Sequence, residues 1–294
     1  FYMFYTIQND HLKVTVNSLG AELHSIQSAD GTEYLWQGNP DVWDGQAPNI
    51  FPYVARLTEQ KYTYDGKEYT MKIHGFINAV ELTPEKQTKE SITLRYDSNE
   101  ETLAQYPFSF IYRITYALKG SVMQVTNEVE NLGSTRMHFG IGGHPGFNVP
   151  LEDGLSFEDY CLEFSHSAHP YRVGFTADCF LNGSDAEYPL VDGTKIPLHH
   201  DLFDDDAIVL KHTDHTVTLH SEKGNRAVRV SFPDYNVIGF WHMPKIEAPY
   251  VCIEPWSSLP SRKGIIEDFG QQADLIALDG GKTYRNEWTV EIIG

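Results

Sequence analysis

Apolar and polar residues alternate in short runs along most of the chain. In the run 112–118 every second residue is apolar, and the run 123–129 largely repeats this pattern after Lys119-Gly120. A period of two is typical of a strand with one buried face, and a short interruption with glycine is typical of a hairpin turn. The segment 112–129 therefore predicts two antiparallel strands joined by a tight turn.

The same pattern recurs in other parts of the chain. The segment 62–73 alternates around Asp65-Gly66, and the segment 217–232 alternates around Lys223-Gly224. Each predicts a hairpin with one buried face. The run 288–292 predicts a last amphipathic strand.

Helical periodicity is scarce. The segment 100–106 predicts at most a short helix, and 265–269 is a weaker second candidate. Strands that recur without helical crossovers are typical of antiparallel sandwiches. No linker or shift in composition divides the chain. We therefore expect an all-β protein in which residues 1–294 form a single domain, built as a large antiparallel β-sandwich.

Composition and charge narrow the possible ligands. The hydrophobic share is 41%, the charged share is 21%, and no apolar stretch approaches the ~20 residues that a membrane helix needs. The formal net charge of -19 repels nucleic acid and anionic membranes, so we expect neither as a partner. A neutral small molecule is the ligand class that this charge favours.

Cysteine and histidine usage gives no metal motif. Cys161, Cys179 and Cys252 are odd in number and far apart in sequence, which argues against a disulfide framework and against a zinc ribbon. Neither His199-His200-Asp201 nor His212-x-x-His215 places two histidines on one face of a strand. We expect no catalytic metal, and we expect the three thiols to be reduced. Because no secretory signal opens the chain, we expect a cytoplasmic protein.

One histidine has an unusual setting. His144 lies in the run Gly142–Asn148, with glycines on both sides and Pro145 directly after it. Glycines remove side-chain bulk, so a ligand could approach the backbone here, and an imidazole of ordinary pKa, roughly 6.5, exchanges protons near neutral pH. The alternative is a structural histidine. The chain also carries Lys72–Phe76 with His74 and Cys252–Trp256 with Glu254, so imidazoles and a carboxylate are available for acid/base chemistry.

Together with Asn49–Arg56, these fragments resemble the aldose 1-epimerase (galactose mutarotase-like) family, especially its shorter bacterial members with a Cys-Ile-Glu-Pro-Trp sequence. The resemblance covers nearly the whole chain. It implies the galactose mutarotase-like supersandwich with a concave sheet face. It also implies that the protein interconverts the α and β anomers of a hexose without a cofactor, with a small-molecule sugar as its partner.

The resemblance also implies two catalytic residues. His144 would protonate the ring oxygen of the sugar, and Glu254 would take the proton of the anomeric hydroxyl. Glu254 precedes Pro255, so it is expected at a strand end, where it could also be an ordinary exposed glutamate. Burial beside Trp256 would raise the pKa of its carboxyl group.

Substrate-binding residues follow from the same resemblance. Arg56 and His74 would hydrogen-bond sugar hydroxyls, although His74 also has a structural reading. An aspartate is expected from the run that ends at Asp206; Asp206 directly precedes an apolar strand and is preferred, with Asp205 second. Trp241 would stack on a sugar face or pack in the core.

Three functions compete at this point. The first is an aldose 1-epimerase acting on a free hexose, and the second is an epimerase acting on a hexose phosphate. The third is a carbohydrate-binding protein without activity, since a fold does not fix a function. The presence of both His144 and Glu254 favours an enzyme, because a binding protein needs neither at a tuned pKa.

Overall fold

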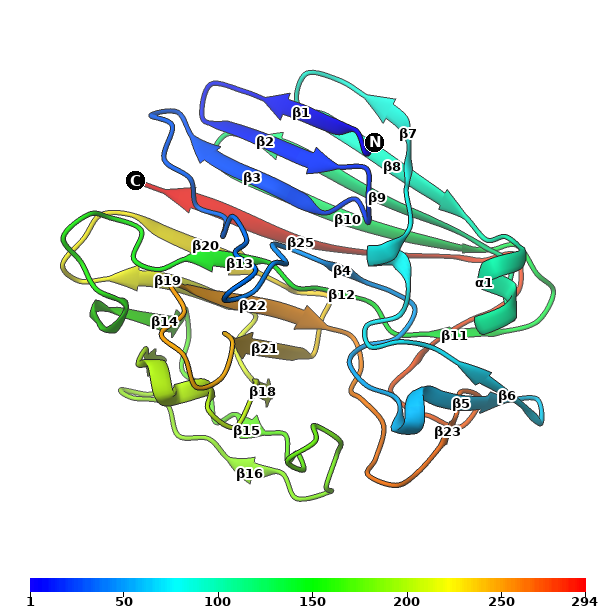
Figure 1. Ribbon diagram of the computed structural model, residues 1–294. Coiled ribbons are helices and arrows are strands. Elements are labelled where there is room, and N and C mark those ends of the chain that lie inside the picture. The colour runs from blue at the N-terminus through cyan, green and yellow to red at the C-terminus, as the bar shows by residue number, and fades with distance from the viewer.

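The alternating runs form antiparallel strands that assemble into two large sheets (Figure 1). The computed structural model describes residues 1–294. A core cluster of 61 buried residues draws on both large sheets and on the small N-terminal sheet. The expected all-β antiparallel sandwich is confirmed, and the single domain over residues 1–294 stays a prediction.

Nine strands form the longer sheet. In spatial order they are β17 (Lys195–Pro197), β14 (Tyr160–Phe164), β19 (Thr216–Ser221), β20 (Ala227–Ser231), β25 (Thr283–Ile293), β10 (Val122–Asn131), β9 (Phe110–Lys119), β8 (Ser91–Asp97) and β7 (Thr83–Gln87). A three-stranded sheet lies against β8 and β9 and contains β1 (Phe4–Gln8), β2 (Leu12–Asn17) and β3 (Leu23–Ser28).

The second large sheet has eight strands and carries the candidate site. Its order is β16 (Ala186–Glu187), β15 (Tyr171–Arg172), β18 (Ile208–Lys211), β21 (Val237–Trp241), β22 (Tyr250–Trp256), β12 (Gly142–Gly143) and β4 (Asn49–Ile50), and β13 (Gly146–Asn148) also pairs with β22. Strand β22 is buried along its whole length. Val251 and Ile253 belong to the main core, so the alternation of side chains turns Glu254 to the opposite face of the sheet.

Smaller elements complete the fold. Two further sheets contain β11 (Met137–Phe139) with β24 (Ile276–Leu278), and β23 (Glu267–Asp268) with β5 (Lys61–Tyr64) and β6 (Lys67–Thr70). The helices are α1 (Glu100–Gln105) and the single 3₁₀ turns η1 (Thr58–Gln60), η2 (Ile77–Ala79), η3 (Phe157–Asp159) and η4 (His200–Phe203). None of these helices has the length and apolar character needed to cross a bilayer.

Most of the predicted elements are confirmed. The hairpin over 112–129 is β9 and β10, with Lys119 opposite Val122, and the hairpin over 217–232 is β19 and β20. The short helix α1 begins after Asn99, whose side chain accepts two backbone N–H groups.

Two predictions of local structure are wrong. The hairpin around Asp65-Gly66 ends at Thr70, and Ile73 lies beyond it with its side chain exposed. The helix expected over 265–269 is absent, because Glu267 and Asp268 form β23 and pair in parallel with β5. That partner strand lies far away in sequence, so a local pattern does not indicate it.

Candidate active site

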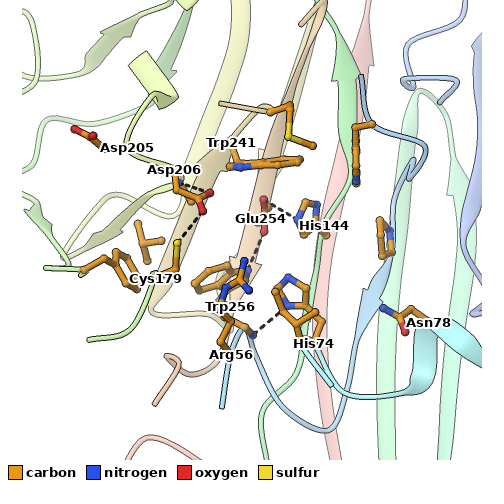
Figure 2. A pocket seen from close by; sticks show the side chains of 18 residues that line it. Arg56, His74, Asn78, His144, Cys179, Asp205, Asp206, Trp241, Glu254 and Trp256 are labelled. Carbon is orange, nitrogen blue, oxygen red and sulfur yellow. Dashed lines mark hydrogen bonds and ion pairs between the residues drawn. The ribbon is translucent and has the colours of Figure 1, made fainter. Parts of the chain in front are cut away.

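A cavity of about 320 Å³ opens on the face of the eight-stranded sheet that points away from the main core. All six side chains predicted from the sequence line it (Figure 2): Arg56, His74, His144, Asp206, Trp241 and Glu254. They come from segments that span positions 56 to 254 and meet only in the folded chain. The structure therefore brings the whole predicted set into one pocket.

His144 and Glu254 form a close pair in this pocket. His144 Nε2 lies 3.2 Å from Glu254 Oε1, and the two side chains are 11% and 2% exposed. The register explains the proximity: Gly142 pairs with Trp256 and Gly146 pairs with Cys252, so position 144 falls opposite position 254. Glu254 lies within β22 and not at its end, so its expected place at a strand end is wrong.

Burial shifts the pKa values of this pair in opposite directions. Desolvation raises the pKa of Glu254 well above its ordinary value, opposed by the indole of Trp256, whose Nε1–H donates to Oε2 over 3.1 Å. Desolvation lowers the pKa of His144 to about 4, so the ordinary imidazole pKa expected from the sequence does not hold. Because burial disfavours both charges, the pair favours one proton held on the carboxyl group beside a neutral imidazole.

The glycines around His144 serve packing and not ligand access. A Cβ on Gly142 would lie 2.5 Å from the carbonyl oxygen of Pro255, and a Cβ on Gly143 would lie 2.8 Å from the indole of Trp288. Both distances are too short for a side chain, so the two glycines let β12 approach its neighbours. The interpretation of these glycines as an approach path for a ligand is therefore wrong.

Aromatic rings hold the imidazole of His144 in place. The ring centroids of Trp43, His74 and Trp241 lie 5.2, 5.5 and 5.6 Å from it. Its Nδ1 atom is buried and has no hydrogen-bond partner. Packing and the contact with Glu254 therefore orient this ring. In many other proteins a hydrogen bond to the second ring nitrogen orients a functional histidine.

His74 presents a donor to the pocket. The backbone N–H of Ala55 donates to His74 Nδ1 over 3.0 Å, so a neutral ring carries its proton on Nε2. Burial, with the nearby His144 and Arg56, lowers the pKa of His74 well below its ordinary value and keeps it neutral. Arg56 itself is exposed and lines the same side of the cavity.

The acidic run reaches the pocket through two residues. Asp206 is half-buried and lies beside Cys179, whose thiol donates to Oδ2 over 2.8 Å, and its Oδ1 accepts the N–H of Ala207 over 2.9 Å. Asp205 also lines the cavity, but it is exposed and points away from the centre of the site (Figure 2). Asp206 is thus the residue whose carboxylate is held toward the pocket.

Some lining residues were missed by sequence reasoning. Trp43 packs against Trp241 with the rings nearly perpendicular and 5.4 Å apart, and it comes from an irregular loop with no motif. Cys179, Met243 and Asn78 also line the cavity. Only the aromatic character of Trp43 could have suggested a sugar site, and nothing in its sequence context placed it there.

Two side-chain clusters have the donor atoms to hold a metal. The ligand atoms of His144, Cys252 and Glu254 lie within 4.8 Å of one another, as do those of Cys161, Glu163 and His220. Cys252 is fully buried and does not line the cavity. The histidines of His199-His200-Asp201 and His212-x-x-His215 belong to neither cluster. The ring of His200 stacks on Phe157.

A supersandwich with a buried imidazole–carboxylate pair on one sheet defines a galactose mutarotase-like protein, and comparisons with known proteins agree. The family model described as aldose 1-epimerase matches residues 3–275. The plasmid LacX protein of Lactococcus lactis subsp. lactis is 34% identical over 287 residues, which cover 94% of this chain and 96% of that protein. The chain therefore belongs to the aldose 1-epimerase family.

Solved structures show the same fold. The galactose mutarotase related enzyme from Lactobacillus acidophilus has a TM-score of 0.94 and 35% identity, and covers 99% of this chain and 97% of its own. A galactose mutarotase-like protein from Lactobacillus casei has a TM-score of 0.93 and 29% identity, and covers 99% of this chain and 100% of its own. The resemblance inferred from the sequence is thus confirmed.

Proposed function

We propose that this protein is an aldose 1-epimerase that interconverts the α and β anomers of a free hexose. The observation that carries the proposal is the 3.2 Å contact between His144 Nε2 and Glu254 Oε1 in a buried pocket. Two groups that can each donate and accept a proton, side by side and facing one cavity, are what hemiacetal opening and closing need. Membership of the aldose 1-epimerase family supports the same reaction class.

The proposed mechanism needs one proton on the pair. With substrate bound, Glu254 as a carboxylate removes the proton of the anomeric hydroxyl, while His144 as an imidazolium protonates the ring oxygen. The bond from C1 to the ring oxygen breaks and leaves an open-chain aldehyde, a protonated Glu254 and a neutral His144. Rotation about the C1–C2 bond presents the other carbonyl face. Closure with both proton transfers reversed then gives the other anomer.

The remaining residues are proposed to hold the sugar. The guanidinium of Arg56 and the Nε2–H of His74 are donors to hydroxyl oxygens, and the carboxylate of Asp206 accepts from hydroxyl groups. Trp241 lines the cavity next to the catalytic pair and offers an apolar surface for the C–H face of the ring. Its edge contact with Trp43 gives it a packing role as well.

The charge of the pocket favours a neutral sugar over a phosphorylated one. Arg56 is the one lysine or arginine among the lining residues, which also include Asp205, Asp206 and Glu254. A phosphate dianion normally needs several cationic partners to offset its desolvation. We therefore expect a higher kcat/KM for free hexoses than for their 6-phosphates. The three unpaired cysteines support a reducing compartment such as the cytoplasm.

Polarimetry on freshly dissolved α-anomers of glucose and galactose tests the proposal. We expect mutarotation well above the spontaneous rate, with Asp205→Asn as a matched control that changes a carboxylate facing away from the centre. Exchange spectroscopy by NMR, which resolves the anomers, extends the test to 6-phosphates. Sugar binding without any acceleration would contradict the proposal and favour a binding protein. A preference for the phosphorylated sugar that disappears at high salt would favour the hexose-phosphate alternative.

A further inference from the structure

Three metal-ligating side chains converge on the outer face of the nine-stranded sheet, and none of them lines the sugar pocket. Cys161 and Glu163 lie two residues apart on β14, and His220 on β19 is directly opposite Cys161 in the antiparallel register. The neighbouring residues on β14 are buried in the main core: Tyr160, Leu162 and Phe164. Alternation along the strand therefore turns Cys161 and Glu163 outward, to the same side as His220.

The ligating atoms of the three side chains meet at one point. His220 Nε2 lies 2.6 Å from Glu163 Oε2 and 3.4 Å from Cys161 Sγ. In a tetrahedral zinc site with Zn–S of about 2.3 Å and Zn–N of about 2.0 Å, neighbouring ligand atoms are roughly 3.3–3.6 Å apart. The sulfur–nitrogen separation already fits this geometry. The imidazole and carboxylate need to separate by less than about 1 Å.

One ring nitrogen of His220 faces both the Glu163 carboxylate and the Cys161 sulfur. Nε2 of His220 carries one proton or one lone pair, so it cannot donate to the Glu163 carboxylate and also accept from the Cys161 thiol. One cation between the three side chains would contact all of them. Thr194 Oγ1 donates to the other oxygen of Glu163 over 3.4 Å, and an outer partner of this kind orients a metal-binding carboxylate.

We propose that Cys161, Glu163 and His220 form a surface site for Zn²⁺ or a similar divalent transition metal, with water as the fourth ligand. Sulfur and imidazole ligands favour such ions over Mg²⁺ and Ca²⁺, and the net charge of -19 attracts cations. The bound ion links β14 to β19. Lys195 opposes Glu163 in the sheet, but its ammonium group is paired with Glu222 at 3.4 Å.

Metal binding at this site is coupled to a proton. The ligand that Cys161 supplies is the thiolate, so binding of the ion displaces the thiol proton.

Titration of the full chain with Co²⁺ under reducing conditions tests the site, because a thiolate bound to Co²⁺ gives a charge-transfer band in the near ultraviolet. We expect one equivalent of Co²⁺ to produce this band, and we expect Zn²⁺ to displace the Co²⁺ and remove the band. Cys161→Ser should abolish the band. His220→Ala and Glu163→Gln should weaken binding by more than the ~10- to 100-fold that loss of an outer partner typically costs. Cys179→Ser, a matched loss of a half-buried thiol elsewhere, should leave the titration unchanged.

Several outcomes would overturn the proposal. These are a wild-type chain without the band at pH 8, a band that survives in Cys161→Ser, and a band that is lost in Cys179→Ser. Stoichiometric loss of mutarotation on adding Zn²⁺ would also overturn it, since that assigns the ion to the cluster of His144, Cys252 and Glu254. Cys161→Ser should melt like the wild type without metal, because its side chain is on the outer face. The band is read without any sugar, so its absence is independent of the proposed epimerase activity.

Discussion

Two walls of the candidate pocket are built from different kinds of backbone. His144 and Glu254 come from paired strands whose register brings them together. A second wall comes from turns and irregular segments, where non-glycine residues adopt the left-handed region of φ. Four of these residues line the pocket: Ala55 at 60°, His74 at 63°, Cys179 at 68° and Asp206 at 74°.

In the proposed reaction, this difference separates proton transfer from substrate recognition. Each left-handed residue costs on the order of 1–3 kcal/mol, and the surroundings must hold it in place. Here the four left-handed residues stabilise one another in pairs, since the Ala55 N–H donates to His74 and the Cys179 thiol donates to Asp206. The sheet gives the two proposed catalytic groups a fixed separation. Irregular backbone aims donors and acceptors in directions that the period-two geometry of a strand does not offer.

The largest effect is expected from changes on the strand wall. Glu254→Gln and His144→Ala should each lower kcat by at least about 100-fold, because each removes one proton-transfer partner. Glu254→Gln keeps the shape of the side chain and an acceptor for Trp256, so its fold should be intact by circular dichroism. Exchange NMR on a free hexose measures the rate. Near-normal turnover in either folded variant contradicts the assigned roles.

A smaller effect on a different kinetic constant is expected from the irregular wall. Arg56→Ala removes charged hydrogen bonds to hydroxyl groups, each worth about 1.5–3 kcal/mol, which corresponds to roughly a 10- to 100-fold rise in KM. The change in kcat should be smaller, because hydroxyl contacts far from the anomeric carbon are similar in the ground and transition states. Initial rates over a range of sugar concentrations separate the two. If kcat falls while KM stays constant, the division between the walls is wrong.

The melting temperature of Glu254→Gln should depend on pH relative to the wild type. Burial raises the pKa of Glu254 in the folded state, so the wild type loses stability as pH rises through this value. At a pH below the pKa of Glu254 in the unfolded chain, this carboxyl group is protonated in both the folded and the unfolded state. The difference in stability between the wild type and Glu254→Gln then disappears. The variant should therefore melt like the wild type near pH 4 and above it in alkaline buffer, by about 2–4 °C for each kcal/mol. If the difference in melting temperature between the variant and the wild type is the same at every pH, desolvation of the Glu254 carboxylate is not its cause.

The smallest effect is expected at Ala55. Ala55→Gly relieves a left-handed alanine, worth about 1–2 kcal/mol, but adds the backbone entropy of glycine, about 0.5–1 kcal/mol. The two nearly cancel, so the melting temperature should change by no more than about 4 °C. The donor to His74 is a backbone N–H and remains, so KM should stay within about twofold of the wild type by the same binding argument. A large rise in KM would show that the methyl group itself shapes the irregular wall.

Local alternation was enough to predict much of the sheet structure. The run 112–129 gave the hairpin of β9 and β10, because turn and strand signals are adjacent in sequence. Glu267 and Asp268 were misread as helical, because their strand depends on a distant partner. The strand β22 was expected to end near Glu254, but pairing with its neighbours continues through Pro255.

The sequence was enough to predict which residues form most of the candidate site, but not their separation, their burial or their pKa shifts. The motifs around His144 and Glu254 identified both residues, and their separation depends on a register that the sequence does not display. Their opposed pKa shifts depend on burial from several elements. Trp43 was missed because tertiary packing brings its loop over the pocket, and no local pattern reports such a contact.

The proton that His144 and Glu254 hold between them has a consequence for how the proposed reaction couples to its surroundings. Ring opening transfers the His144 proton to the ring oxygen and the anomeric hydroxyl proton to Glu254, and ring closure reverses both transfers, so the protein is the same before and after each turnover. No exchange with bulk solvent is needed to reset it, and buffer concentration should not limit the rate. The same cycle runs from either anomer, so the direction of net flux is set by whichever anomer neighbouring reactions consume.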